Sequence, residues 1–254
     1  MEKIKYQKKD EIAKNRQLIQ MNGSFTAYQR KALNLLLKTS IDQEIKGNKK
    51  KHYKMPLSHF KATMGYKKDS LTLQEISNPL HDLQSKSFME LTGHSIASSS
   101  LLPYFKLDEK KRTLQWKLTK AVRKILLENR YVVLDLATIN AMKSSYAIAL
   151  YEFLKNKHIN KKNNTYQEIN LTIDNFREIM GINKKQYARF NNLKARVIDK
   201  AIREINDKSD LYVYLEPLKT GTKTNELVFH FAELNSKEKQ NTIKLEQKIK
   251  EDLQ

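Results

Sequence analysis

The sequence contains no cysteine among its 254 residues. This absence excludes a disulfide framework and any metal site built from thiolates, and it is typical of a protein in a reducing cytoplasm. Glycine is also scarce, because there are only six, and no two are spaced for a Walker A loop or a dinucleotide-binding fingerprint. The sequence therefore excludes a P-loop nucleotide hydrolase.

Histidine offers no recognisable metal site. None of the six histidines belongs to a His-x-His pair, with which a metal-dependent DNA-nicking enzyme would hold its cation near a nucleophilic tyrosine. No local motif marks a Ser/His/Asp triad or a carboxylate pair, although the members of such triads are dispersed along a chain. We therefore expect no catalytic residue, no metal and no cofactor, and a protein that is not an enzyme.

Long apolar stretches are missing as well. No segment approaches the ~20 apolar residues that a membrane-spanning helix needs. The segment from Met1 to Lys5 contains no apolar core of a signal peptide. We therefore expect a cytoplasmic protein without a membrane partner.

Acidic residues are few relative to basic ones. Asp and Glu number 28 against 48 Lys and Arg, which gives a formal net charge of +20. The abundance of Lys, Asn and Ile is typical of AT-rich genomes, but codon bias alone would not leave the acidic residues so far behind. A polyanionic partner is expected, and nucleic acid is favoured over a membrane surface.

The length accommodates two domains, each with its own core. Residues 1–20 are polar and basic, and we expect them to form a flexible arm. A first domain over 21–130 and a second over 131–235 follow, with the boundary close to residue 130. The mixed-charge tail over 236–254 has few apolar residues.

The first domain begins with a helix for which Thr26 is a good N-cap. A short helix over 57–64 ends at Gly65, and a longer helix follows over 71–85 with a kink expected at Pro79. Strand-like apolar runs then lie near 87–91, 101–107 and 113–118.

The second domain repeats this order. A helix is predicted over 145–157, a short helix over 174–180 that ends at Gly181, and a long helix over about 184–206. Strands over 211–215 and 226–231 follow, joined by a turn over 219–223. A short helix, a glycine turn, a long helix and a β-hairpin form the order of a winged helix-turn-helix.

The two domains also share residues. Phe60, Met64 and Gly65 have the same spacing as Phe176, Met180 and Gly181. At one constant offset, four apolar residues of the first long helix align with four of the second, namely Leu73, Ile76, Leu80 and Leu83 with Ala195, Ile198, Ile202 and Ile205. We therefore predict a helix-rich α+β fold of two tandem winged-helix domains related by internal duplication.

The long helix of the second domain carries the strongest binding signal. On a wheel of 3.6 residues per turn, one stripe holds Lys185, Arg189, Asn192, Arg196 and Arg203. The opposite side holds Phe190, Leu193, Val197, Ala201 and Ile205. An ordinary solvated face usually mixes charges of both signs, whereas this stripe has only Asp199 near it. The stripe is therefore predicted to contact DNA.

Residue chemistry divides this surface into two roles. Arg and Asn have the geometry for bidentate contacts with guanine and adenine, so Arg189, Asn192 and Arg196 are assigned to base edges. Phosphate contacts are assigned to Lys184, Lys185, Lys219 and Lys223, the last two on the wing, and Gln186 completes the predicted set. Lys194 projects onto the apolar arc, so either the helix is bent there or Lys194 reaches around its rim.

The first domain carries a weaker version of this pattern. Its candidate DNA-binding residues surround the start of its long helix and comprise Lys67, Lys68, Ser70, Thr72 and Gln74. The outward face is less basic than in the second domain. The first domain is thus expected either to contact DNA less tightly or mainly to join subunits.

Several segments resemble the iteron-binding, theta-type plasmid replication initiators. They are residues 144–154, 187–194 and 201–206 and the wing ending at 228–231, and the resemblance runs from about Asn15 to Phe231. It implies two winged-helix domains that bind directly repeated origin sites, promote opening of an AT-rich segment and recruit a host initiator and helicase. It also implies a monomer–dimer equilibrium, in which dimers joined through the first domain bind an operator inverted repeat, repress the initiator gene and so control plasmid copy number.

The resemblance bears on individual residues. Arg189, Lys194 and Arg196 match basic positions of the family's recognition helix. Ala195 stands where relatives can have Arg, which implies a different repeat sequence. Two alternatives remain open from the residues: a winged-helix transcriptional repressor without a replication role, and a nickase or primase that acts at an origin with a divalent cation.

Overall fold

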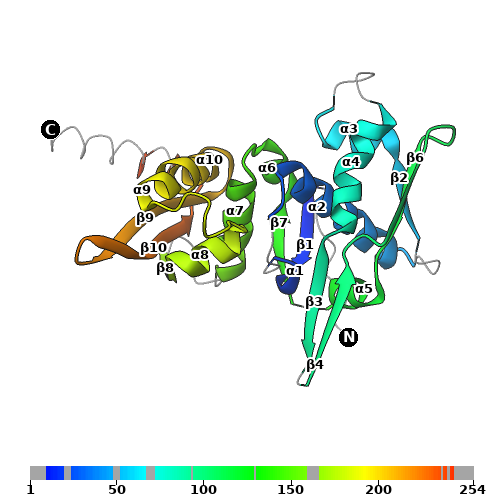
Figure 1. Cartoon of the computed structure of the whole chain (residues 1–254). Coiled ribbons are helices and arrows are strands. Elements are labelled where there is room, and N and C mark those ends of the chain that lie inside the picture. Colours follow the sequence, from blue (N-terminus) through cyan, green and yellow to red (C-terminus); the bar gives the residue numbers. More distant parts are fainter. Residues whose placement is uncertain are drawn as a thin grey trace. The chain divides into compact units, whose positions relative to one another are not determined.

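The computed structural model describes residues 10–19, 24–47, 52–66, 72–92, 94–128, 130–158, 166–235, 237–238 and 241–242 (Figure 1). Contacts divide the chain into two compact units, Met1–Ser145 and Tyr146–Gln254. Most of the predicted tail over 236–254 lies outside the described residues.

The first unit is built around helix α2 (Ala27–Ile45), which begins after Thr26 as predicted. Thr26 and Gln29 form a capping box, because the Gln29 backbone N–H donates to Thr26 Oγ1 at 3.1 Å and the Thr26 N–H donates to Gln29 Oε1 at 2.9 Å. Leu36 and Leu37 are completely buried. This helix therefore provides much of the core of the unit.

The helix-turn-helix of the first unit consists of α3 (Leu57–Thr63) and α4 (Leu73–Gln84). Gly65 follows α3 with φ +75°, a conformation that favours glycine. The helix α4 buries Ile76, Leu80 and Leu83. Both predicted helices are confirmed, with bounds that differ by one or two residues.

The first unit also contains a three-stranded antiparallel sheet in the order β2-β6-β5, formed by β2 (Tyr53–Pro56), β5 (Tyr104–Asp108) and β6 (Thr113–Lys117). A separate hairpin, β3 (Ser87–Thr92) with β4 (Ser95–Ser100), extends from the body of the unit (Figure 1). The strand predicted over 101–107 begins only at Tyr104, because Leu101 and Leu102 turn into the core before Pro103. Strand β4 was not predicted, since its serine-rich sequence lacks apolar alternation.

Residues 10–19 belong to the fold, in contrast to the flexible arm predicted over 1–20. Strand β1 (Glu11–Asn15) pairs antiparallel with β7 (Tyr131–Asp135), and α1 (Arg16–Ile19) follows it. The buried side chains of Ile12 and Leu18 explain this order. The sequence did not reveal the pairing because its two strands lie far apart in the chain.

The same pairing explains why the division between the units lies later than the predicted boundary near residue 130. Strand β7 pairs with β1, and α6 (Leu136–Ala141) packs against α2. The Asn15 side chain also donates to the carbonyl of Ile125, on α5 (Lys120–Leu126), at 2.6 Å. Residues 131–145 consequently pack with the first unit.

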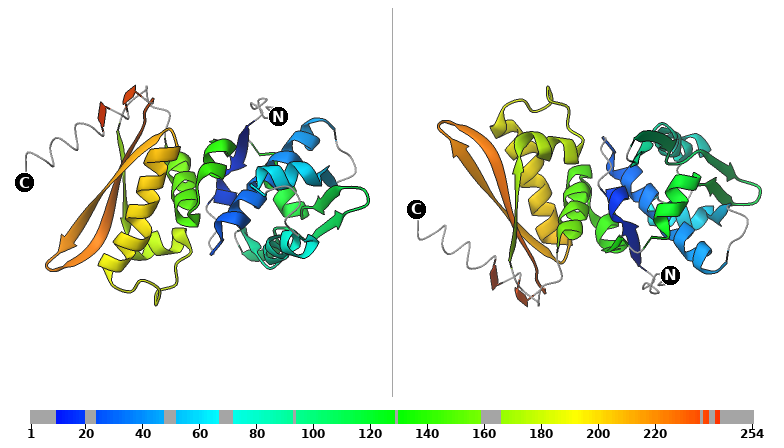
Figure 2. Two further views of the ribbon diagram at one scale, coloured as in Figure 1. Left: turned by 90° about the horizontal axis from the view of Figure 1, so that it is seen from above. Right: turned by 90° about the horizontal axis from the view of Figure 1, so that it is seen from below.

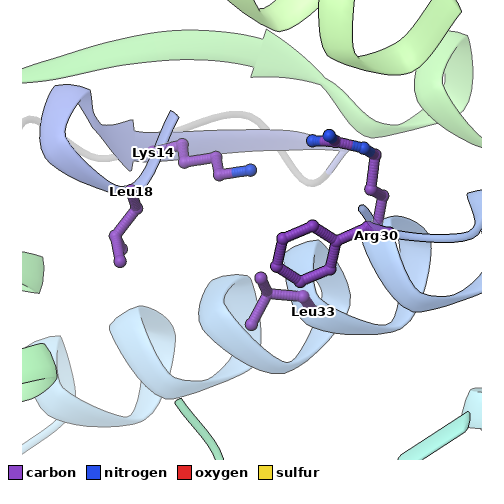
Figure 3. Close-up of a pocket in the computed structure, with 5 residues that line it drawn as sticks. Lys14, Leu18, Arg30 and Leu33 are labelled. Carbon is purple, nitrogen blue, oxygen red and sulfur yellow. The ribbon is translucent and has the colours of Figure 1, made fainter. Parts of the chain in front are cut away.

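A small pocket of the first unit lies beside β1, α1 and α2 and is lined by two nearly buried cations, Lys14 and Arg30 (Figure 3). Leu18, Phe25 and Leu33 complete the lining, and the Arg30 guanidinium lies 5.2 Å from the centre of the Phe25 ring. The volume of about 10 Å³ is close to that needed by one water molecule. The pocket is therefore too small for an organic cofactor.

The second unit contains the predicted elements in the predicted order, with one additional strand between the first two helices. It contains α7 (Ser145–Lys157), β8 (Gln167–Thr172), α8 (Ile173–Met180), β9 (Leu211–Thr220) and β10 (Lys223–Glu233). The strands form one antiparallel sheet in the order β8-β10-β9, with the helices on one side and the β9–β10 hairpin extending beyond them (Figure 2). Phe176 of α8 stacks on Phe229 of β10, with 5.6 Å between the ring centres. Strand β8 was not predicted.

Candidate nucleic-acid interface

The long helix of the second unit begins at Phe190 and not near residue 184 as predicted. Helix α9 (Phe190–Leu193), the π-helical segment η1 (Lys194–Ile198) and α10 (Asp199–Lys208) follow one another without a break. Residues 183–189 instead form a turn, in which Tyr187 has φ +52°. This left-handed conformation is incompatible with a continuing α-helix.

Because the helix begins only at Phe190, the predicted cationic stripe does not lie on one continuous helix. Lys184, Lys185, Gln186 and Arg189 precede the helix, so a helical wheel does not describe their positions. They are nevertheless exposed, as are Asn192, Arg196 and Arg203 on the helix itself. The polar surface of this segment is therefore confirmed, although turn and helix together build it.

The π-helical segment explains the anomalous position of Lys194. The backbone N–H of Asp199 donates to the Lys194 carbonyl, five residues earlier, and Lys194 Nζ donates to Asp199 Oδ1 and Oδ2 at 2.8 and 2.9 Å. A π turn contains more residues than an α turn, and it brings these two side chains together. Lys194, predicted to contact DNA, thus already has a carboxylate partner.

The widened turn also keeps the apolar side in place. Leu193, Val197, Ala201 and Ile205, each four residues apart, are all completely buried. Ala195, aligned with the half-buried Leu73 in the predicted repeat, is exposed. Ala195 therefore does not contribute to the core, whereas Ile198 and Ile205 are buried like their aligned partners Ile76 and Leu83.

Arg177 organises the turn from the core. Its side chain is on α8 and the residue is only 6% exposed. Arg177 Nη1 donates to the carbonyls of Asn183 at 3.3 Å and Gln186 at 2.7 Å, and Nη2 donates to the carbonyl of Tyr187 at 2.7 Å. Arg177 was not predicted as a functional residue, because a single arginine in a short helix carries no periodic signal of burial.

A tyrosine of α7 supports the same turn. The phenol of Tyr146 hydrogen-bonds with the side chains of Tyr187 and Gln186, and burial is the main cause of the raised pKa of Tyr146. Gln186 was predicted to bind DNA, and its side chain is exposed while it contacts Tyr146. The turn is thus held from two helices of the second unit.

The wing of the second unit is the hairpin of β9 and β10. Gly221 lies at its tip with φ +64°, and Lys219 and Lys223 beside it are exposed. The strands pair in register from Leu211 to Thr220, with an irregularity between Thr224 and Glu226. The predicted turn is thus present but shorter than 219–223, because β9 continues to Thr220 and β10 begins at Lys223, and the two cations lie on the strand ends.

In the first unit, the predicted site is only partly described. Lys67, Lys68 and Ser70 lie outside the described residues. Thr72 caps α4, where its N–H and hydroxyl donate to Glu75 Oε2 at 2.8 and 2.9 Å, while Gln74 donates to Asn78 Oδ1 at 3.0 Å. These two residues have structural partners within the first turns of the helix.

The first unit has a second basic surface, which was not predicted from the sequence. The turn between β5 and β6 presents Lys110, Lys111 and Arg112, all exposed, and the Lys111 N–H donates to Asp108 Oδ1 at 2.9 Å. The basic run is visible in the sequence, but only the hairpin formed by its flanking strands places it at an exposed tip, where it can contact DNA. It corresponds to the wing of a winged helix.

No group of three or more His, Asp or Glu side chains in the described residues is placed to hold a metal ion. Within the same residues, no helix has the length and apolar character required to cross a membrane.

Two family models match the chain. The one described as "Initiator Replication protein, WH1" matches residues 11–155, and the one described as "Initiator Rep protein, WH2" matches residues 172–231. The chain belongs to this family of replication initiators. The two predicted winged-helix domains, the α+β fold and the resemblance to replication initiators are thereby confirmed. A transcriptional repressor without a replication role is no longer favoured.

Solved structures share the fold of this initiator. It is similar to the Pi initiator protein crystallised in complex with iteron DNA, with 16% identity, a TM-score of 0.63, and coverage of 91% of this chain and 100% of that one. It is also similar to domains 2 and 3 of RctB, with 10% identity, a TM-score of 0.54 and 82% of each chain covered. No curated protein sequence matches the initiator.

Proposed function

We propose that this initiator binds directly repeated sites, or iterons, in the origin of a plasmid as double-stranded DNA. The observation that carries the proposal is the segment from Lys184 to Arg203, whose outer side is exposed and basic and whose inner side is apolar and buried. The iteron DNA bound by the similarly folded Pi protein supports the same ligand class. Family membership supplies the context of replication.

The side chains of the second unit have two roles in binding DNA. Arg189, Asn192 and Arg196 read base edges, where each good bidentate contact discriminates by about 1–3 kcal/mol. Lys184, Lys185, Lys219 and Lys223 contact phosphates and set the register. Gln186 lies at the edge of this surface, and Lys194 reaches DNA only by exchanging its Asp199 partner.

The first unit makes an auxiliary contact. The wing residues Lys110, Lys111 and Arg112 bind phosphates without reading sequence, and Lys67, Lys68, Ser70, Thr72 and Gln74 remain proposed contacts around the start of α4. The first unit also joins two copies as a dimer, which binds an operator inverted repeat and represses the initiator gene.

The initiator acts by binding and assembly and performs no catalysis. Occupied repeats promote opening of an AT-rich segment, to which a host initiator and helicase are recruited. Supercoiled origin DNA incubated with the protein and Mg²⁺ is expected to remain unnicked. A site-specific nick would contradict the non-enzymatic role.

The experiment that tests the proposed function is plasmid maintenance. The gene and its flanking DNA, placed as the sole origin, are expected to sustain replication in a permissive host, whereas Arg189→Ala combined with Arg196→Ala abolishes it and leaves folding intact. Arg130→Ala, an exposed arginine of the first unit, is the matched control and should maintain the plasmid. Replication by the folded double variant would contradict the assignment.

A further inference from the structure

Arg177 makes an unusual set of contacts for a buried cation. All three of its carbonyl acceptors belong to the turn over 183–189, and none belongs to its own helix. Among the described residues, no carboxylate forms an ion pair or hydrogen bond with its guanidinium. The charge is thus compensated by backbone carbonyls of one loop, which is the loop that carries Lys184, Lys185 and Gln186.

These contacts are suited to fixing one loop conformation. A guanidinium is planar and presents five donors in a rigid fork, so it satisfies several carbonyls only when they hold particular positions. Tyr187 has φ +52°, and a non-glycine residue keeps such a conformation only where its surroundings impose it. Arg177 donates to the Tyr187 carbonyl, and Tyr146 contacts the Tyr187 side chain.

Stability alone does not account for a cation at this position. Burying a charge carries a desolvation cost, and an apolar side chain of similar volume often serves stability as well or better. The fixed turn leads directly into Arg189 and helix α9. The conformation of the turn therefore determines how Arg189 and α9 are oriented toward a ligand. Displacements of about 1 Å are enough to weaken a site built on directional hydrogen bonds.

We propose that Arg177 is a positioning residue for sequence recognition, which it performs without touching DNA. It holds the turn over 183–189 so that Arg189 and Asn192 meet base edges in one geometry. The inference rests on the proposed function, because it assumes that this turn and helix face DNA. It predicts that loss of the Arg177 contacts removes discrimination between sequences and leaves phosphate binding.

The test compares Arg177→Met, which keeps length and loses all donors, with Arg177→Lys, which keeps the charge and one donor group. The matched control is Lys155→Met. Lys155 is another cation of the second unit, with a side chain only 11% exposed; it lies on α7 and pairs with Asp210 at 2.8 Å and with Glu233, not with the turn. Circular dichroism and melting report folding. Fluorescence anisotropy gives the affinity for a duplex carrying one of the direct repeats that a footprint on the DNA flanking the gene identifies, and for a scrambled duplex.

Arg177→Met is expected to lower the ratio of repeat affinity to scrambled-duplex affinity by roughly tenfold or more, which is the effect of losing one base contact. Its affinity for the scrambled duplex should change by less than about twofold. The affinity ratio of Arg177→Lys should lie between that of Arg177→Met and that of the wild type. Lys155→Met should reduce the melting temperature and leave the ratio unchanged. An unchanged ratio in folded Arg177→Met would overturn the positioning role.

If Arg177→Met does not fold, the folded Arg177→Lys protein decides in the same way: a reduced ratio supports the inference and a wild-type ratio contradicts it. A wild-type protein that binds both duplexes equally would overturn the proposed function and the role of Arg177 with it. A wild type that discriminates, together with an Arg177 variant that also does, would overturn the positioning role alone.

Discussion

At the scale of the residue, Lys194 and Asp199 show how a local backbone irregularity alters the chemistry of a binding surface. The side chains are 40% and 36% exposed and lie 2.8 Å apart, so their pairing contributes less than about 1 kcal/mol to stability. Its larger effect is on charge, because the carboxylate of Asp199 offsets one cation in the centre of the proposed DNA-binding segment.

Asp199→Asn is therefore expected to increase DNA affinity. The substitution frees Lys194 for a phosphate and removes a negative charge near the ligand, so the slope of log affinity against log salt should steepen by about 0.9. Asp207→Asn removes the same charge from the Lys208 pair at the end of α10 and should change the slope less. Weaker binding by folded Asp199→Asn would show instead that the pair positions the helix.

At the scale of the element, the local signals of the sequence located most helices. Thr26 and its capping box fix the start of α2, and Gly181 with φ +66° ends α8 as predicted. The predicted start of the long helix in the second unit was wrong, because the true start depends on the contacts between Arg177 and the turn over 183–189 and on the conformation of Tyr187. Such tertiary contacts leave no periodic pattern in the sequence.

The same limit applies to the β-structure. Strand β1 pairs with β7 across more than a hundred residues, as Ile12 opposite Leu134 shows. A five-residue strand with a polar sequence has too little alternation to be recognised alone. Of the candidate site, the exposed cations of the second unit could be predicted from residue type, whereas Arg177 and the wing at Lys110–Arg112 required the fold.

Thr26→Ala tests the contribution of the capping box to the first unit. The loss of the cap is expected to lower the free energy of unfolding by about 1 kcal/mol, within a typical range of 0.5–2, as measured by urea denaturation. Thr39→Ala lies within the same helix, where the hydroxyl donates only to the Leu35 carbonyl at 2.9 Å, and should change stability little. Equal effects of both substitutions would argue against the cap.

The wing of the first unit makes a separate prediction. Lys110→Ala combined with Lys111→Ala should weaken binding to all duplexes alike and reduce the salt slope by about 2, because each lost phosphate contact accounts for about 0.9. Lys120→Ala with Lys124→Ala makes the same charge change on α5 and is the matched control. A sequence-dependent loss would mean that this wing reads bases.

At the scale of the whole molecule, the net charge of +20 is divided between two winged-helix domains of one replication initiator. The fold provides each domain with a helix-turn-helix and a basic hairpin, and the second domain adds the exposed Arg and Asn side chains suited to base recognition. The proposed division of labour follows: both domains bind phosphates, and the second supplies most of the sequence discrimination.

The most direct test of this account is a footprint of the purified protein on the DNA that flanks its own gene, at two salt concentrations. We predict protection of several direct repeats, spaced by roughly two helical turns so that successive copies lie on one face of the duplex, with weaker protection at higher salt. Protection of one inverted repeat alone, or of no site at all, would contradict it.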